Sequence, residues 1–283
     1  MHKPVLVTGA SSGIGEAAAV TLARAGFRVF AAARRIEKLK AIEGLGEGRI
    51  TALALDVTDE GSIAAAAERF KAEGAVLYGL VNNAGISVTG PIEEVPLAEW
   101  RAQFETNLFG VVAVTKAFLP AMRAARAGRI VNIGSVSGRL APPFMGAYAA
   151  SKHALEGFND SLRRELAPYG IKVSLIRPGF IHTPFGGPEQ EGLSRYVGPG
   201  HPYSERVAAF KAWHAKGHPN GAPPSAVADA IAQALTAARP HSRYTVPASV
   251  IPPVMLRNLL PSAIVDRAFA ATTGIDRRKE AAP

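Results

Sequence analysis

Apolar runs alternate with helix-like stretches through the first two-thirds of this 283-residue chain, and this alternation restricts the fold more than any other feature. A continuous apolar run is typical of a strand that is buried on both faces of a parallel sheet. Because crossovers between parallel strands are right-handed, we predict an α/β fold with a doubly wound parallel sheet (Rossmann fold) in a three-layer sandwich. The expected strands are 5–8, 28–33, 50–55, 79–81, 129–133 and 172–176, and the expected helices are 13–25, 36–42, 60–73, 97–126 and 148–169.

The composition changes after Pro178-Gly179. The following residues are rich in Gly, Pro and His, which is typical of a mobile loop or lid. A helix is expected at 225–237 and a strand at 244–246, before an apolar, proline-containing tail that we expect to fold back onto the core as a helix. The predicted organisation is a single domain, with 1–247 as its Rossmann-type part, 180–222 as a loop or lid within it, and 248–283 as a C-terminal extension.

A glycine-rich turn joins the first expected strand to the first expected helix. Glycines permit the tight turn and the close backbone approach that a pyrophosphate needs at a helix N-terminus. The spacing is Gly-x-x-x-Gly-x-Gly, and the commoner one is Gly-x-Gly-x-x-Gly. The strand before the turn and the helix after it favour nucleotide binding over a purely structural turn. The candidate nucleotide contacts are Gly9, Ser11, Ser12, Gly13, Ile14 and Gly15.

The end of the second expected strand indicates which dinucleotide binds. An NAD site needs an acidic residue about 20 positions beyond the glycines, where it hydrogen-bonds the ribose hydroxyls. This region reads Ala31-Ala32-Ala33-Arg34-Arg35 and contains no carboxylate. The Arg34 guanidinium can bind a 2′-phosphate, which an acid would repel. We therefore expect NADP(H) in preference to NAD(H); the alternative is that Arg34 is an exposed or helix-capping residue.

Two further strand ends carry candidate cofactor contacts. Asp56-Val57 ends the third strand, where a carboxylate can meet the adenine amine, although Asp56 can instead cap the next helix. Small residues end the fourth strand in Asn82-Asn83-Ala84-Gly85, and they would let a nicotinamide riboside lie against the backbone. The candidate contacts are Asp56, Val57, Asn83, Ala84 and Gly85.

Tyr148 and Lys152 stand one helical turn apart, with Ser135 thirteen positions upstream. Side chains at i and i+4 share one face of a helix. A lysine cation about 4 Å from a phenol, at an effective dielectric of about 20, contributes about 4 kcal/mol, or roughly three pKa units. Such a pair can move a proton on or off an alcohol or carbonyl oxygen. The alternative is a surface helix that carries Tyr and Lys by chance. Without further motifs this alternative would be favoured, because the spacing Tyr-x-x-x-Lys is common on helices.

Together these residues resemble the short-chain dehydrogenase/reductase family. The resemblance covers about residues 3–183 and returns loosely in 223–246. It implies that Tyr148 is the acid/base, that Ser135 rather than Ser137 binds the substrate oxygen, and that Lys152 lowers the Tyr148 pKa and holds the nicotinamide ribose. It also implies that Asn107 anchors a water in a proton relay. The residues of the cofactor site that it adds to those above are Tyr148, Lys152, Pro178, Gly179, Ile181 and Thr183.

The sequence is similar to the NADP-preferring branch of that family, in which a small residue followed by Arg matches Ala33-Arg34. It departs from many NADP-preferring members at Ser11-Ser12, where they carry a Lys or an Arg. Arg34 is therefore the main expected contact of the phosphate. The segment 176–183 and the extended tail resemble, more loosely, the hydroxysteroid and retinol-type members.

The resemblance implies an NADP(H)-dependent oxidoreductase that interconverts an alcohol and a ketone or aldehyde. An NAD(H)-dependent dehydrogenase of the same family and a non-catalytic nucleotide-binding regulator are the alternatives; a regulator has no need of all four catalytic residues. Seven residues expected near the pocket suggest a small apolar substrate, although they can equally pack the lid. They are Phe144, Met145, Phe180, Phe185, Tyr196, Tyr203 and Trp213.

Composition and charge argue against disulfides, metal sites and nucleic-acid binding. The absence of cysteine excludes disulfides and thiolate metal sites. The net charge is +9, but the basic residues are scattered without aromatic interleaving, which favours a solvated basic surface over nucleic-acid binding. We interpret four histidines as having no nearby carboxylates and no His-x-x-x-His spacing on a helix, so we expect no metal site. They are His182, His201, His214 and His218.

A strand-like run begins within five residues of Met1, which leaves no room for a signal peptide. The longest apolar stretch, 108–122, is shorter than a membrane span and contains Lys116. We therefore expect a cytoplasmic protein without a membrane span. The long helices expected at 97–126 and 148–169 resemble the usual dimer interface of the family and predict a homodimer or homotetramer.

Overall fold

The computed structural model describes residues 3–257 and 259–275. Within these residues, parallel strands form one sheet in the order β3-β2-β1-β4-β5-β6-β7. The apolar runs form these strands because helices cover both faces of the sheet. The strands are β1 (Pro4–Thr8), β2 (Arg28–Ala33), β3 (Ile50–Ala54), β4 (Gly79–Asn82), β5 (Gly128–Ile133), β6 (Ile171–Pro178) and β7 (Arg243–Val246).

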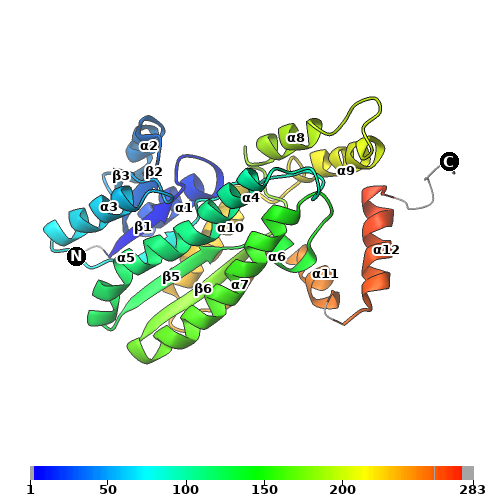
Figure 1. Ribbon diagram of the computed structural model, residues 1–283. Helices are drawn as coiled ribbons and strands as arrows, with labels where there is room; N and C mark the ends of the chain where they lie inside the picture. Colours follow the sequence, from blue (N-terminus) through cyan, green and yellow to red (C-terminus); the bar gives the residue numbers. More distant parts are fainter. Residues whose placement is uncertain (1–2, 258, 276–283) are drawn as a thin grey trace.

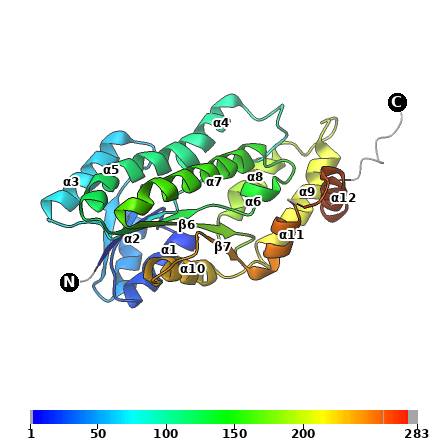
Figure 2. The same cartoon turned by 90° about the horizontal axis from the view of Figure 1, so that it is seen from below.

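Helices cover both faces of this sheet, as the two perpendicular views show (Figure 1, Figure 2). On one face α1 (Gly13–Arg24), α2 (Ile36–Glu43) and α10 (Pro224–Thr236) bury apolar side chains against the strands. On the other face lie α3 (Glu60–Ala72), α5 (Gly110–Ala124) and α7 (Gly146–Leu166). The predicted doubly wound, three-layer fold is therefore confirmed.

The helix expected at 97–126 is continuous but changes its winding. It consists of α4 (Leu97–Phe104), a π-helical turn η2 (Glu105–Phe109) and α5. The extra residue of such a turn rotates the side chains that follow it. Elsewhere the expected boundaries shift by at most three residues, and short turns appear at η1 (Gly44–Gly46), α6 (Ser137–Leu140) and η3 (Ala167–Tyr169).

The segment 180–222, predicted as a mobile loop or lid, contains two helices, α8 (Gly186–Ser194) and α9 (Ser204–Gly217). Leu193, Val207 and Phe210 are buried and pack together, which stabilises both helices. Most of the Gly and Pro residues that suggested a loop lie at the ends of the helices or between them. The expectation of a loop was wrong because the Gly and Pro content was taken as evidence against helices, although apolar residues at helical spacing are also present in this segment.

The tail forms two α-helices where one was expected. After η4 (Ala248–Val250), α11 (Ile251–Leu256) and α12 (Ser262–Thr273) follow. In Figure 1 they lie below α8 and α9, at the end of the molecule that is far from α2 and α3, and α12 packs against α9. Residues 276–283 of the predicted extension lie outside the described residues. Among the described residues, no helix has the length and apolar character needed to cross a membrane.

Candidate active site

The order in which the strands are added to the sheet reverses between β1 and β4. Strands β2 and β3 lie on one side of this point, and β4 to β7 lie on the other. In open α/β sheets, ligands bind outside the carboxyl ends of the strands at such a point. A cavity of about 890 Å³ lies there. Almost all the predicted site residues line it, namely Gly9, Ser11, Ser12, Gly13, Ile14, Arg34, Asp56, Val57, Asn83, Ala84, Gly85, Ser135, Tyr148, Lys152, Pro178, Gly179, Ile181 and Thr183.

Gly15 does not line this cavity, and its glycine serves packing instead. A Cβ at Gly15 would lie 2.3 Å from the Gly9 carbonyl oxygen. At Gly9 the backbone has φ +65°, and a Cβ would lie 2.7 Å from Cα of Ala84. The turn after β1 therefore packs directly on the segment after β4, and only glycine fits at these two positions.

The segment after β4 holds the glycine-rich turn in place. The Asn83 side chain donates hydrogen bonds to the carbonyl oxygens of Thr8 and Gly9, at 3.0 and 3.1 Å. In return, Oγ1 of Thr8 accepts from the backbone N–H groups of Asn83 and Ala84, at 3.0 and 3.1 Å. The predicted contact Asn83 thus also builds the cradle in which a dinucleotide would lie.

Cations gather where β2 ends. Arg34, Arg35 and Lys38 line the cavity there, although only Arg34 was predicted. Burial alone would raise the pKa of Asp56, but hydrogen bonds from Thr58 and the charge of Arg34 together lower it. Asp56 does not cap the next helix.

The actual N-cap of α3 is Asp59, whose side chain accepts from the N–H of Gly61 at 2.9 Å. The alternative role considered for Asp56 is therefore wrong. Its carboxylate instead accepts from the N–H and the hydroxyl of Thr58, at 2.9 and 2.8 Å, at the edge of the cavity.

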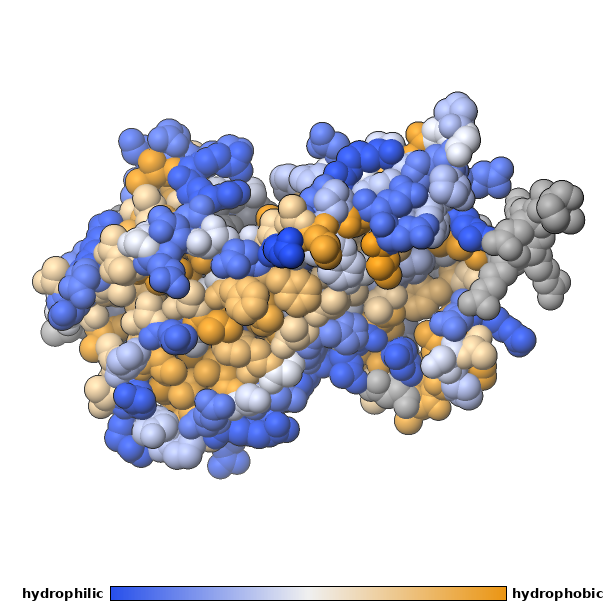
Figure 3. Space-filling view, viewed as in Figure 1, coloured by the Kyte–Doolittle hydropathy of each residue, from blue (hydrophilic) through white to orange (hydrophobic). Residues whose placement is uncertain are grey.

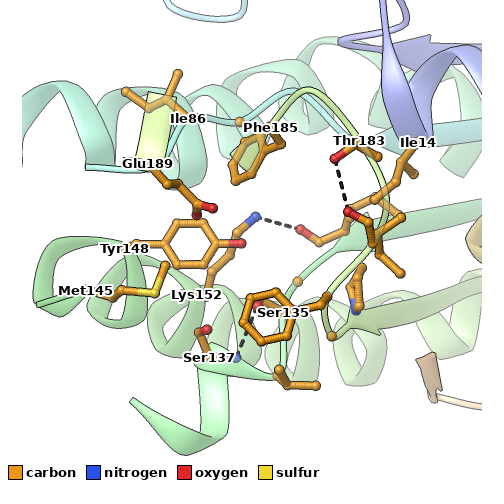
Figure 4. A pocket seen from close by; sticks show the side chains of 18 of the residues that line it. Ile14, Ile86, Ser135, Ser137, Met145, Tyr148, Lys152, Thr183, Phe185 and Glu189 are labelled. Atoms are coloured by element: carbon orange, nitrogen blue, oxygen red, sulfur yellow. Dashed lines mark hydrogen bonds between the residues drawn. The ribbon is translucent and has the colours of Figure 1, made fainter. Parts of the chain in front are cut away.

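Tyr148 and Lys152 point from the first turns of α7 into the cavity, opposite Ser135 at the end of β5 (Figure 4). All three side chains are buried. The Lys152 ammonium donates to the carbonyl oxygen of Ile133 at 2.8 Å and lies 5.7 Å from the centre of the Tyr148 ring. The end of β5 and the helix α7 thus bring the three predicted residues together.

The expected lowering of the Tyr148 pKa by Lys152 is wrong for the protein alone. Burial raises the Tyr148 pKa, the nearby Glu189 carboxylate raises it further, and the hydrogen bond with Ser135 offsets only part of this. Burial also lowers the pKa of Lys152 to about 8. Desolvation therefore exceeds the attraction between the Lys152 cation and an ionised Tyr148 that the helical spacing suggested. Tyr148 is therefore held as a phenol, which is the form that donates a proton.

Asn107 does not line the cavity but supports its wall. It lies in the π-helical turn and is buried. Its side chain accepts from the N–H of Ile86 at 2.9 Å and donates to the carbonyl oxygen of the same residue at 3.0 Å. It also donates to the Ser151 hydroxyl at 3.3 Å. Ile86 lines the cavity, so Asn107 positions that wall against α7; its predicted role in a water relay stays a prediction.

A buried polar chain fixes α7 on the sheet. Asn82 of β4 donates to Asn132 of β5 at 2.8 Å, and Asn132 donates to Asn159 of α7 at 3.0 Å. Because an unpaired polar group inside a protein is costly, this chain determines the register of α7 against the strands. The polar chain thereby places Tyr148 above the end of β5.

Apolar residues of the second half of the chain form another wall of the cavity. Of the seven residues expected near a substrate, Met145, Phe180, Phe185 and Trp213 line the cavity, whereas Phe144, Tyr196 and Tyr203 pack behind it. The tail contributes a wall that was not predicted, although its apolar residues at helical spacing could have indicated it. These residues are Val250, Pro253, Leu256, Leu260, Ile264, Val265, Ala268 and Phe269.

Glu189, His214 and His218 also line the cavity and were not predicted as site residues. The expectation that the histidines form no helical pair is wrong, because His214 of α9 and His218, which directly follows α9 in helical conformation, are four residues apart. Glu189 of α8 supplies the missing carboxylate, 2.9 Å from Nε2 of His218. The sequence shows the histidine pair but not the carboxylate, which only the packing of α8 on α9 brings near.

Comparisons with known proteins agree with this geometry. Residues 3–193 match the short chain dehydrogenase family. The chain is 47% identical over 189 residues to the uncharacterized oxidoreductase YusZ of Bacillus subtilis. The aligned segment covers 65% of this chain and 67% of the relative. It is 38% identical over 201 residues to a 3-ketodihydrosphingosine reductase of Bacteroides thetaiotaomicron, covering 71% of each chain. Human retinol dehydrogenase 16 is 43% identical over 184 residues, or 64% of this chain and 57% of the relative.

Solved structures are similar over most of the chain. A short-chain dehydrogenase from Streptomyces avermitilis has a TM-score of 0.80 at 32% identity, covering 98% of this chain and 99% of that one. A family member from Burkholderia phymatum in complex with NAD has a TM-score of 0.79 at 27% identity, covering 91% and 93%. ElxO with NADP bound has a TM-score of 0.71 at 28% identity, covering 87% and 97%. The chain therefore belongs to the short-chain dehydrogenase/reductase family of oxidoreductases.

Proposed function

We propose that this protein is an NADP(H)-dependent oxidoreductase that interconverts an apolar alcohol and its ketone or aldehyde. One observation carries the proposal: Tyr148, Ser135 and Lys152 face the same cavity that the glycine-rich turn and Arg34 line. A dinucleotide is supported by the glycine-rich turn that lines this cavity at the N-terminus of α1, where a pyrophosphate would meet backbone N–H groups. A nicotinamide dinucleotide is also bound by the similar proteins from Burkholderia phymatum and by ElxO.

In the proposed reaction, bound NADPH supplies a hydride to the carbonyl carbon. Tyr148 donates its phenolic proton to the carbonyl oxygen, which Ser135 holds by a hydrogen bond. Lys152 keeps a positive charge behind the phenol and favours the tyrosinate that is left. In the oxidation of an alcohol the same groups act in reverse.

The preference for NADP over NAD rests on charge. Arg34, Arg35 and Lys38 line the cavity beyond β2, and residues 31–35 carry no carboxylate to bind ribose hydroxyls. A 2′-phosphate brings up to two negative charges, which guanidinium groups bind through charge-assisted hydrogen bonds. Similar structures hold either cofactor, so an NAD(H)-dependent enzyme is the alternative.

An apolar substrate is proposed from the walls of the cavity. Phe185 lies with its ring centre 6.1 Å from that of Tyr148, and the tail helices continue the apolar wall. A cavity of about 890 Å³ is at the upper end of the range for ligand sites, roughly 300–1,000 Å³. In this proposal α8 and α9 form a lid over the substrate. The extension 248–283 packs on the core as a further part of the proposal.

Absorbance of NADPH and NADH tests the proposal. Purified protein is mixed with each cofactor and with ketones and aldehydes of increasing apolar length, and oxidation of the cofactor is followed. We expect faster turnover with NADPH and a KM that falls as the apolar part grows. Equal use of both cofactors would contradict the NADP preference. Tight cofactor binding without turnover of any carbonyl or alcohol would favour the nucleotide-binding regulator.

We also propose a homodimer or homotetramer in the cytoplasm. Figure 3 shows apolar side chains gathered over α5 and α7, and Phe109, at the start of α5, is 53% exposed. A monomer in light scattering after size exclusion would contradict the oligomer. Cell fractionation tests the location, and a gel-shift assay tests the prediction that nucleic acid is not a partner.

A further inference from the structure

Glu189, His214 and His218 direct their side-chain atoms at one point between α8 and α9. Oε2 of Glu189 lies 2.9 Å from Nε2 of His218 and 3.4 Å from Nε2 of His214. One ligand atom from each of the three residues lies within 4.8 Å of the others. Ligand atoms about 2.0–2.2 Å from one ion in a tetrahedral arrangement are roughly 3.3 Å apart. The distances from Glu189 to the two histidines are thus close to this spacing, and the histidine atoms lie within 4.8 Å of each other.

The opposite nitrogens of both rings have partners of their own. Nδ1 of His218 lies 2.9 Å from the carbonyl oxygen of Ile181, so it carries the hydrogen and leaves the Nε2 lone pair free to bind. Nδ1 of His214 lies 2.9 Å from Nε2 of Gln190. A 180° rotation of this amide exchanges its nitrogen and oxygen, and Gln190 then accepts from Nδ1–H and holds His214 in the same tautomer. Such partners are what orients metal-binding imidazoles.

The charges of the cluster suit a cation. Glu189 and His214 are buried, and a buried carboxylate needs a positive partner. Nε2 of each histidine lies close to Oε2 of Glu189, so a divalent cation between the three groups would be the positive partner that this carboxylate needs.

We propose that Glu189, His214 and His218 form a binding site for a divalent transition-metal ion of the Zn²⁺ type. Two imidazoles and one carboxylate suit Zn²⁺ better than Mg²⁺ or Ca²⁺, which prefer oxygen ligands. Since all three residues line the cavity, a fourth position faces the space beside Tyr148 (Figure 4), where water or an oxygen atom of a substrate can bind.

The ion has two physical consequences. It clamps α8 to α9, and through the bond between His218 and Ile181 it ties both helices to the segment after β6. It also neutralises the Glu189 charge, one of the influences that raise the Tyr148 pKa. The site therefore links the lid helices to the acid/base residue, and it does not depend on which cofactor or substrate the enzyme uses.

Calorimetric titration with ZnCl₂ tests the site in the full chain, after treatment with a chelator and without any nucleotide. We expect saturable binding of one ion per chain, weaker binding at lower pH as protons compete for His218, and no comparable binding of Mg²⁺. The double variant His214→Gln/His218→Gln should lose this binding. His201→Gln is the matched control, because His201 also pairs with a carboxylate, Glu94 at 2.8 Å, but lies outside the cluster.

Equal Zn²⁺ affinity in the wild type and the double variant would overturn the proposal, as would no saturable binding by the wild type. Circular dichroism shows whether the double variant is folded. If it is not, Gln190→Ala replaces it, since it keeps all three ligands and removes only the partner of His214. Binding should then weaken by roughly 10–100-fold; unchanged binding in this variant would overturn the proposal.

Discussion

The two ends of the cavity are built by different physical means. The cofactor end consists of turns that follow β1, β2, β3 and β4, and backbone hydrogen bonds between the strands hold these turns in place. The substrate end consists of α8, α9, α11 and α12, which lie outside the sheet and are held mainly by side-chain contacts. The difference implies a cofactor end that tolerates few substitutions and a substrate end that can change its shape without loss of the fold.

Aromatic packing shows how the substrate end is held. The ring of Phe180 lies 5.4 Å from that of Trp213 and 5.2 Å from that of His218, measured between centres. A Cβ at Gly217 would lie 2.5 Å from the Phe180 ring. A single aromatic residue just beyond β6 thus positions the C-terminal end of α9, without any backbone hydrogen bond of the sheet.

The largest effect is expected where the two ends meet, at Tyr148. Tyr148→Phe removes the proton that the carbonyl oxygen needs and should lower kcat by roughly 10²–10⁴-fold. The affinity for NADPH, measured by fluorescence titration, should change little because the glycine-rich turn and Arg34 are intact. Retained turnover would show that Tyr148 is not the acid.

The cost of burying Lys152 can be measured through the pH dependence of the free energy of unfolding. Its pKa is about 8 in the folded protein against an ordinary 10.5. Between these values the unfolded chain binds more protons, so this residue makes stability rise with pH; below about 8 both states are charged and the full cost of burial is present. Relative to Lys152→Met, wild-type stability should increase by up to about 3 kcal/mol from pH 7.5 to pH 10.

Urea unfolding of both proteins over this pH range measures the difference. Because other groups titrate equally in the two proteins, only the difference between them is interpreted. A constant difference would mean that Lys152 keeps its ordinary pKa in the folded protein.

Arg34→Ala changes the cofactor end alone. Loss of a charge-assisted hydrogen bond costs about 1.5–3 kcal/mol, so the Kd of NADPH should rise by roughly 10–150-fold and that of NADH should not. Arg24→Ala is the control, since Arg24 is an exposed residue of α1 that does not line the cavity. An equal loss for both cofactors would refute a phosphate contact.

Phe269→Ala changes the substrate end alone and should have the smallest effect. Phe269 of α12 is partly buried and lines the cavity. Loss of about 1 kcal/mol of apolar contact should raise the KM of a long apolar substrate about fivefold. The Kd of NADPH should not change. Leu259→Ala, at a residue that is 76% exposed, is the control; an equal effect there would show that α12 does not contact the substrate.

The cofactor end could be predicted from the sequence because its rules are local. A glycine-rich turn after a strand, the absence of an acid at 31–35 and a helical Tyr-Lys spacing each depend on residues close together in the chain. Parallel strands then bring their carboxyl ends to one edge, so Gly9, Asn83 and Ser135 converge wherever the sheet forms.

Only the tertiary structure decided the rest. The Tyr148 pKa depends on burial and on Glu189, 41 positions along the chain, and both influences oppose the shift that the spacing of Tyr148 and Lys152 suggested. Glu189 meets His218 because α8 packs on α9, and the tail becomes a wall because α12 packs on α9. Helix packing sums many weak side-chain contacts with no fixed spacing, so the substrate end depends on the whole fold.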